Sequence, residues 1–543
     1  MATTIDKYNS VIKTLGIPLP NWVQDEDDQV RVGAYDGYTS MYRNVPTTFQ
    51  VVMRGAEDRP LYIPSAKRVV EAVNRYLAKG WKWTVASASD NPADQLTVQV
   101  ALQKLMTREA MEAKFLSYKR NMLLKGDAFW HVMADLSKPA GDRISVKELD
   151  PRSCFRIANA VDNDVTDGWY IVTLYWVDQN TQIAQRLEYR KQQVAPGSPV
   201  TIFSQLTFWE TNAWDDRFIG HQPLKPVAVP EVYSTDANLA PLLAGQTLPP
   251  SITALPVYHT RNVDFGTEPF GISQIAGIET LIAALNQTAS DEDISIALQG
   301  LGVFCTDSAP PKDSEGNETD WFISPGVVLE MKKESKFWRI EGISSVTPMQ
   351  DHISFLRDAM DNSSGLSAVA VGKVDVAVAQ SGIALRLEMA PVLAQNEEKE
   401  IELRSVLDVM THDLVFMWLP LDGTKPAEDI TVTNTFSDPI PVDRAATVKE
   451  ITDLVTAQLM SKAFAIAYLQ RTLGYQFPET MLDDIGTEVD FVAQRLANID
   501  DPGAGATPDG STGGTAATTV TPPPPGGQPA GASPQSQTAG VAG

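Results

Sequence analysis

Acidic side chains gather at places where carboxylates could bind a metal ion or transfer a proton. Paired carboxylates are ligands for magnesium and can act as general acid and base. The clusters are Asp25 to Asp28, Asp291 to Asp293, Glu397 to Glu402 and Asp483-Asp484. Because Lys399 interrupts the third cluster within a helical stretch, we interpret it as a solvated helix face rather than a metal site.

Other catalytic signatures fail on residue type or spacing. The closest approach to a phosphate-binding loop, Gly372-Lys373-Val374, lacks the hydroxyl for magnesium and a correctly spaced first glycine. Cys154 and Cys305 have no neighbour at metal-ligand spacing. No pair of histidines has the helical spacing of zinc ligands, so we expect structural or surface roles for His131, His221, His259, His352 and His412. We expect no catalytic residue, no metal and no cofactor.

Two aromatic pairs, Trp81 with Trp83 and Phe129 with Trp130, could stack on nucleic-acid bases. No basic residues surround them in a groove-like pattern, so we interpret them as core packing. The net charge also argues against a nucleic-acid surface, since 68 acidic and 44 basic residues give −24 over 543 residues. This balance argues against a protein that holds nucleic acid mainly by neutralising phosphates, although DNA could still slide past such a surface.

Composition also bounds the class of protein. Hydrophobic residues at 43% and charged residues at 21% are typical of folded chains. The N-terminus lacks the apolar core of a signal peptide and no run of 18 apolar residues occurs, so we expect an intracellular, soluble protein. Residues 501–543 consist mostly of Gly, Pro, Ala, Ser and Thr, which predicts a flexible tail.

The first 270 residues predict an α+β region. Ser65 can cap a helix that stops at Gly80, and a second helix is predicted from Val98 to Lys125, ending at Gly126. Aromatic and β-branched residues then favour an antiparallel meander. Its strands are expected at Trp169 to Val177, Ala184 to Gln192 and Val200 to Trp209.

Long helices are predicted after this region. Apolar residues recur at helical spacing from Ile272 to Gln299, some 28 residues or roughly 42 Å of helix. An insertion, 300–346, precedes a second helix with Thr347 as N-cap and Pro348 at the first helical position, ending near Gly365.

A third helix is expected after a loop. Residues 365–380 read as an exposed flexible loop whose only charges are Lys373 and Asp375. The helix runs from Ser381 to about Trp418, and Pro391 within it predicts a kink. A strand at Asp429 to Phe436 and helices capped by Asp443 and Ser461 complete the pattern.

Several segments together resemble the portal proteins of tailed bacteriophages, in particular the siphophage branch. The segment from Pro256 to Asp291, with Asn262, Phe270-Gly271-Ile272-Ser273, Asn286 and Ser290-Asp291, is similar to the entry into that family's first stem helix. The segment from Gly365 to Leu393 is similar to its tunnel loop and kinked helix. Supporting matches are Arg120 to Asp135 and the helices from Ser461 to Ala497.

The resemblance implies a portal-like architecture in named parts. They are a wing at 1–271, stem helices at 272–300 and 347–364, a clip at 301–346, a tunnel loop at 365–380, a kinked helix and wing return at 381–440, and a crown at 441–500. The disordered tail at 501–543 is predicted from composition and has no counterpart in that architecture.

It also implies a function. Such subunits form a ring, usually a dodecamer, at one capsid vertex, through which double-stranded DNA is packaged and ejected. The implied partners are the major capsid protein, the terminase large subunit and the head–tail adaptor, with assembly in the host cytoplasm and residence in the virion. Lys373 and Asp375 are then expected DNA-channel residues and Pro391 a helix hinge. The alternatives are another capsid-associated structural protein, such as an adaptor or scaffold, and a metal-dependent hydrolase.

Overall fold

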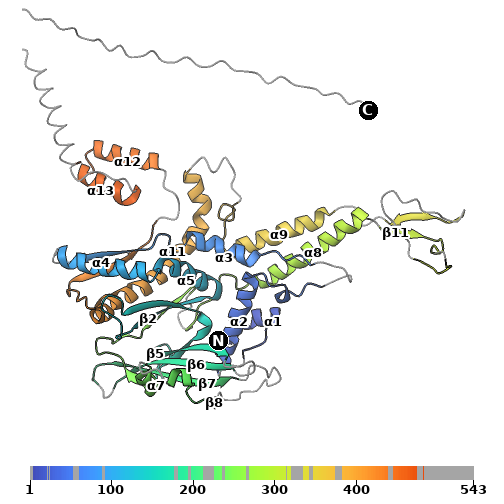
Figure 1. The fold of residues 1–543 in the computed structure, drawn as a ribbon. Coiled ribbons are helices and arrows are strands. Elements are labelled where there is room, and N and C mark those ends of the chain that lie inside the picture. The colour runs from blue at the N-terminus through green and yellow to red at the C-terminus, as the bar shows by residue number, and fades with distance from the viewer. Residues whose placement is uncertain are drawn as a thin grey trace, which may run out of the picture. The chain divides into compact units, whose positions relative to one another are not determined.

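The fold is that of a mixed α and β protein, as the sequence predicts (Figure 1). The computed structural model describes residues 4–20, 23, 25–52, 60–87, 92–176, 182–193, 197–211, 225–234, 239–263, 268–301, 303–312, 315–319, 334–340, 346–372, 382–437, 444–473 and 481. The chain divides into two compact units, Met1–Val442 and Asp443–Gly543. Within the described ranges, no helix is long and apolar enough to cross a membrane.

The first unit holds most of the described helices and every described strand. Its helices are α1 (Thr4–Leu15), α2 (Glu26–Tyr42), α3 (Ser65–Tyr76), α4 (Pro92–Arg108), α5 (Met111–Lys125), α6 (Glu231–Ser234), α7 (Ala240–Ala244), α8 (Glu279–Leu301), α9 (Thr347–Ser363) and α11 (Gly382–Asp413). Its strands are β1 (Lys82–Ser87), β2 (Asp127–Ala134), β3 (Ile144–Leu149), β4 (Cys154–Ala158), β5 (Thr166–Trp176), β6 (Gln182–Gln192), β7 (Thr201–Thr211), β8 (Lys225–Pro226), β9 (Gln246–Thr247), β10 (Val257–Arg261), β11 (Val303–Thr306), β12 (Phe337–Ile340) and β13 (Ile430–Thr435).

The strands form four antiparallel sheets. The predicted meander is confirmed, since β5, β6 and β7 pair in sequence within the sheet β4-β5-β6-β7-β8, with β9 on β7. A three-stranded sheet has the order β10-β2-β3, and β11 pairs with β12. The predicted strand near the end of the unit is also confirmed: β13 pairs with β1 in a two-stranded ribbon, with Lys82 opposite Thr435.

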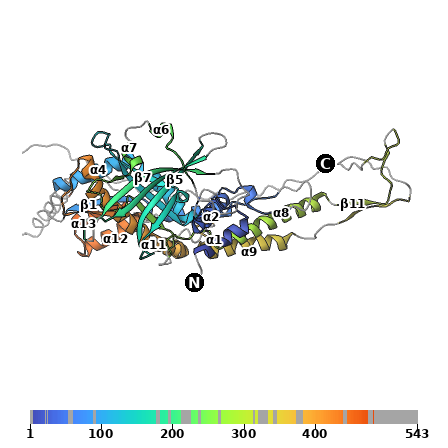
Figure 2. The same ribbon diagram turned by 90° about the horizontal axis from the view of Figure 1, so that it is seen from below.

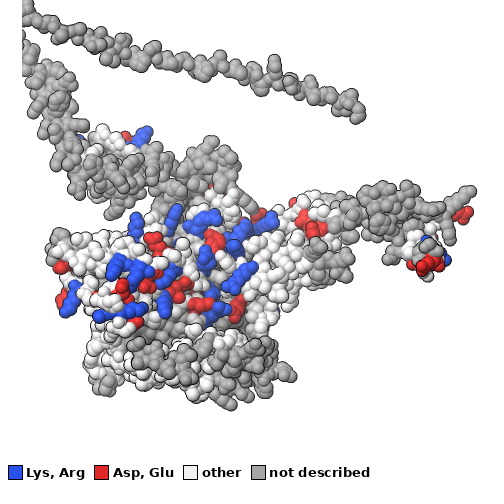
Figure 3. Space-filling model, viewed as in Figure 1, with Lys and Arg blue, Asp and Glu red and all other residues white. Residues whose placement is uncertain are grey.

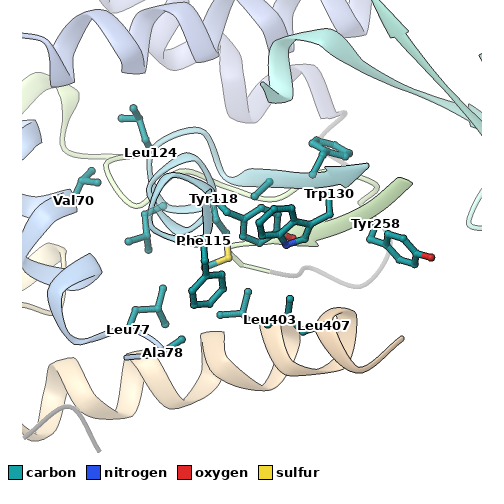
Figure 4. Packing of buried hydrophobic residues seen from close by; sticks show 14 of the residues in the cluster. Val70, Leu77, Ala78, Phe115, Tyr118, Leu124, Trp130, Tyr258, Leu403 and Leu407 are labelled. Carbon is teal, nitrogen blue, oxygen red and sulfur yellow. The ribbon is translucent and has the colours of Figure 1, made fainter. Parts of the chain in front are cut away.

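An aromatic core lies between α3, α5, β2 and α11 (Figure 4). Trp130 stacks on Tyr118 with ring centroids 4.7 Å apart, and both side chains are buried. Trp81 is buried too, and its indole N–H donates to Asn434 Oδ1 over 2.7 Å. The interpretation of the aromatic pairs as core packing is therefore confirmed for Trp81, Phe129 and Trp130, while Trp83 packs partly buried against the same core.

The predicted helix from Val98 to Lys125 is wrong as a single element. It is two helices, α4 and α5, separated at Glu109 and Ala110, where Ala110 has a left-handed φ of 49°. Glu109 turns toward β3, because its carboxylate binds Lys114 and accepts the backbone N–H of Val146. The predicted stop is confirmed, since Gly126 ends α5 with a φ of 93°.

Three predicted helix starts differ from the structure. Helix α8 begins at Glu279 rather than Ile272, because Ser273 and Gln274 bond to the last carbonyls of α5, and the residues that follow form turns, with Ala276 N–H donating to Ser273 O and Ile278 N–H to Ile275 O. Thr347 and Ser65 are the first residues of α9 and α3 rather than their N-caps, which are Val346 and Pro64.

The loop expected at 365–380 is only partly described. The prediction of exposure is wrong for Leu366 and Ala370, which are buried in the main core, whereas Ala368 and Gly372 are exposed. Lys373 and Asp375 lie outside the described residues.

The long third helix occurs as predicted. Helix α11 passes through Pro391, and a π-helical stretch carries it on from Leu414 to Trp418. In Figure 1 the first turns of α11, in gold, run at an angle to its orange remainder.

The second unit is described through α12 (Arg444–Thr456) and α13 (Lys462–Leu473). Ser461 caps α13 as predicted, since its hydroxyl accepts the N–H of Phe464 over 3.2 Å. The other predicted cap, Asp443, and the predicted tail at 501–543 lie outside the described residues.

Candidate functional site: the junction at the base of α8

Two glycines bring the end of α5 and the segment before α8 into backbone contact. A Cβ atom on Gly271 would lie 2.2 Å from the carbonyl oxygen of Gly126, and one on Gly126 would lie 2.8 Å from Gly271. Asn262 seals the contact, because its backbone N–H donates to Gly126 O over 2.8 Å. Any side chain at either glycine would push these backbones apart.

The residues before α8 complete the C-terminus of α5. The last carbonyls of a helix have no partner within it. Ser273 Oγ donates to Leu124 O over 2.6 Å, and Gln274 N donates to Leu123 O over 2.8 Å. The chain therefore enters α8 from a position bonded to α5.

A buried carboxylate anchors the junction from the side of β2. Asp127 accepts from the backbone N–H of Gly271 over 2.8 Å and from the Tyr35 hydroxyl, and His259 Nε2 lies 2.6 Å from its Oδ1. Burial alone would raise the pKa of Asp127, but the hydrogen bond and charge of His259, together with the other donors, lower it below its usual value. The ionised form is thus the one that this site stabilises.

Aromatic rings and a buried arginine enclose this carboxylate. His259 stacks on Phe129 with centroids 4.4 Å apart. The Arg31 guanidinium lies 4.0 Å from the centroid of Phe270 and donates to Cys154 O over 3.0 Å. The histidine and the arginine act here as packed structural groups, as expected for His259.

One turn of helix α8, from Asn286 to Ser290, is hydrogen-bonded to residues 61–63. Asn286 Oδ1 accepts the N–H of Ile63, and Ser290 Oγ accepts the N–H of Leu61, each over 2.9 Å. The adjacent helix α9 is held to α3, because Arg68 bonds Asp361 through both guanidinium amines, at 2.6 and 3.3 Å.

Helix α11 reaches the same junction just beyond Pro391. Lys399 is buried, and its ammonium donates to Asn262 Oδ1 over 2.8 Å. Burial lowers the pKa of Lys399 to about 8. Asn262 also donates to Ile272 O over 2.8 Å, so one side chain connects α11 with the entry to α8.

Beyond the junction, α8 and α9 pack on each other and carry the β11–β12 hairpin at their far end (Figure 2). Large apolar side chains along this arm are about half exposed or more. They are Ile296 on α8, Trp338 on β12 and Phe355 on α9.

The junction offers little for catalysis. Asp127 and His259 resemble the acid and base of a hydrolase, but the contacts to Tyr35 and Gly271 already use both carboxylate oxygens. Among the residues that the structure describes, no group of three His, Cys, Asp or Glu could hold a metal ion. The arrangement positions helices.

Where the structure describes them, the acidic clusters that the sequence singles out do not come together in one site. Asp25 caps α2, and Asp28 pairs with Arg31. Within Glu397 to Glu402, the interpretation as a solvated face holds for Glu397 and Glu398, whereas Lys399 is buried. Residues 291–293 lie on α8, and 483–484 lie outside the described residues.

The predicted site residues are only partly placed. Pro391 lies within α11 on its exposed side, whereas the channel residues Lys373 and Asp375 fall outside the described ranges. Sequence reasoning missed the pairing of Asp127 with His259, which are 132 residues apart. The resemblance did quote Asn262, Gly271 and Ser273, which meet at this junction.

Comparison with known proteins gives a distant likeness. No family model matches the sequence, and no curated protein matches it. Among solved structures, a chain of the virion of a native gene transfer agent particle is 11% identical, with a TM-score of 0.37, covering 81% of this chain and 100% of that one. A chain of the neck of a native gene transfer agent particle, computed with C12 symmetry, is 11% identical, with a TM-score of 0.38, covering 76% and 96%. TM-scores of this size do not establish a common fold.

Proposed function

We propose that this chain is a portal subunit of a phage-like particle, forming a ring, usually of twelve copies, through which double-stranded DNA enters and leaves the capsid. The observation that carries the proposal is the order of elements after the junction. A long helix, a small hairpin, a returning helix and a long helix with an internal proline follow one another, as α8, β11–β12, α9 and α11. This order is the one that the resemblance implies.

The parts of the subunit follow from this proposal. The body up to 271 is the wing, α8 and α9 are stem helices within 272–300 and 347–364, and β11–β12 belongs to the clip at 301–346. Residues 365–380 form the tunnel loop, 381–440 the kinked helix and wing return, 441–500 the crown and 501–543 the tail. The half-exposed apolar side chains of the α8–α9 arm support the proposal, because such residues are typical of surfaces that pack against another subunit.

Transport in this proposal needs no catalysis by the subunit itself. A bore with acidic walls repels phosphates and prevents DNA from adhering, while Lys373 touches the backbone intermittently and Asp375 repels it. Pro391 lets the loop shift as DNA moves, since proline weakens a helix at its own turn. Terminase and then the head–tail adaptor dock on the clip, and the major capsid protein surrounds the ring in the virion.

Images of the purified chain test the proposal directly. Negative-stain class averages should show rings with a central hole. Assemblies without a hole, or a monomer with metal-dependent turnover, would contradict it and favour an adaptor, a scaffold or a hydrolase. In a packaging assay, Pro391→Ala should slow DNA entry, and packaging equal to the wild type would count against the hinge.

A further inference from the structure

One end of the β1–β13 ribbon brings three cations together around residues 435–437. Lys82 pairs with the first of these residues across the ribbon, and the carbonyl of Lys79 accepts the backbone N–H of the last over 2.7 Å. The guanidinium carbon of Arg404 lies 5.5 Å from the ring centroid of Phe436, the residue between them. We call Lys79, Lys82 and Arg404 the ribbon-end cations.

These cations are available to a ligand. All three side chains are exposed, and none forms an ion pair with a residue that the structure describes. The carboxylates one helical turn from Arg404 are bonded elsewhere, since Glu400 accepts the N–H of Ala78 over 2.7 Å and Asp408 accepts the N–H of Asn434 over 3.1 Å. The ribbon-end cations therefore keep their capacity to bind an anion.

The two lysines belong to a positive stretch of an acidic chain. Residues 61–126 contain eleven Lys and Arg against five Asp and Glu, whereas the whole chain carries −24. Figure 3 shows Lys and Arg gathered over this part of the first unit, with Asp and Glu among them. An anion that meets the ribbon end is thus repelled less there than by the rest of the chain.

The outward face of the ribbon adds hydroxyl groups beside these cations. Its exposed cross-strand pairs are Lys82 with Thr435, Thr84 with Thr433 and Ala86 with Thr431. Each of the three threonines on β13 donates only a long hydrogen bond, of 3.4 or 3.5 Å, to a carbonyl of β1. Bonds of this length are weak, so these hydroxyls can turn toward a ligand. No large apolar side chain lies among these six residues.

Cations and hydroxyls without an apolar anchor fit a phosphate backbone better than a protein surface. Protein–protein contacts depend on buried aromatic and aliphatic anchors, which this face lacks. Lys, Arg and Thr side chains bind the phosphate oxygens of DNA without reading its sequence. The opposite end of the ribbon is acidic, because Glu428 is exposed there and Asp429 bonds Ser87 over 2.8 Å. A phosphate backbone is therefore expected at the cationic end.

We propose that the ribbon-end cations, with the threonines beside them, bind the phosphate backbone of double-stranded DNA independently of its sequence. The proposal rests on the proposed function for the source of the phosphates, because a particle that packages DNA holds duplex next to its subunits. It names residues other than Lys373 as a place where DNA is held. Three neutralised phosphates give weak binding, with a slope of log K against log salt of about −2.7.

The salt dependence of binding tests this site in the full-length chain. Fluorescence anisotropy of a labelled duplex is measured from about 50 to 200 mM salt. Lys79→Gln and Lys82→Gln should each reduce the slope by about 0.9, because one counterion fewer is released. Arg404→Gln should do the same, whereas Arg404→Lys keeps the charge and should keep the slope. Lys13, exposed on α1, which packs on α2 and α8, provides the matched control Lys13→Gln, which should bind like the wild type.

Several outcomes would overturn the proposal. They are a wild-type chain that binds no duplex, unchanged slopes in both lysine variants, an equal loss in Lys13→Gln, and unequal affinities for AT-rich and GC-rich duplexes. Polyglutamate that displaces the duplex at equal charge would identify an acidic protein segment as the occupant and overturn it as well. Rings with a central hole that bind no duplex would remove this site and leave the proposed function intact. Salt-dependent binding with the expected slopes, by a chain that forms no ring, would support the site and contradict the proposed function.

Discussion

Alanine substitutions can measure how much the backbone contact between Gly126 and Gly271 constrains the fold. They separate two effects: the lack of room for a Cβ atom and the left-handed backbone conformation. Gly271 has an ordinary backbone conformation but no room for a Cβ atom, which would meet the Gly126 carbonyl at 2.2 Å. Gly277 has a left-handed φ of 87° but nothing within 4 Å of an added Cβ. Gly126 combines a left-handed φ of 93° with backbone neighbours at 2.8 Å. Alanine at the three positions therefore tests sterics, conformation and both together.

The expected losses of unfolding free energy differ in size. Gly277→Ala should cost about 1 kcal/mol, because left-handed strain is partly offset by the lower entropy of the unfolded chain. Gly271→Ala should cost about 3 kcal/mol, the upper end for overpacking, since backbone atoms cannot rotate out of the way. Gly126→Ala should cost about 4 kcal/mol, because both effects apply.

Urea unfolding followed by tryptophan fluorescence provides the assay. Trp169 lies beside the junction, with its ring centroid 5.4 Å from that of His259, and the summed emission of the 11 tryptophans follows unfolding of the chain. The unfolding midpoint should fall in the order Gly277→Ala, Gly271→Ala, Gly126→Ala. If Gly271→Ala unfolded at the same urea concentration as Gly277→Ala, the close approach would not constrain the junction and the reasoning would be refuted.

Further predictions concern charges and hydrogen bonds around the junction. The folded-state pKa of Lys399 is lowered to about 8, so the unfolded chain binds more protons from there to about pH 10.4, and stability should rise with pH by up to about 3 kcal/mol relative to Lys399→Met. Urea titrations at pH 7, 8.5 and 10 check this, and equal slopes for both chains would contradict it. Asp361→Asn breaks the ion pair between α9 and α3 and should cost about 1–2 kcal/mol in urea unfolding, whereas the exposed Asp351→Asn on the same helix should cost almost nothing. Ser273→Ala leaves a carbonyl of α5 unpaired and should cost about 1–2 kcal/mol, against no change for the exposed control Ser405→Ala, and equal melting temperatures of the two variants would count against the capping role.

Local chemistry made much of the fold predictable. The meander follows from β-branched and aromatic residues in alternation, and the end of α5 follows from the left-handed conformation that Gly126 tolerates. Helix α11 contains Pro391, as predicted. Each of these signals lies within one or two turns of the residue that it explains.

Long-range contacts account for what sequence reasoning missed. The apolar spacing from Ile272 onward favours a helix. Ser273 and Gln274 instead donate hydrogen bonds to carbonyls at the end of α5, and α8 begins only at Glu279. The pairing of Asp127 with His259 has no local signature, since it forms only when β10 aligns with β2. A left-handed alanine, Ala110, has no sequence signal either, and it divides the predicted second helix.

The β1–β13 ribbon can form only late in the synthesis of this protein. Trp81 and its acceptor Asn434 are separated by 353 residues, which a ribosome adding about 5–20 residues per second takes roughly 20–70 s to synthesise. Throughout that interval the indole N–H of Trp81 lacks its acceptor, and β1 lacks the strand with which it pairs. A nascent chain released before β13 emerges should therefore remain a substrate for chaperones and proteases, which would remove incomplete chains.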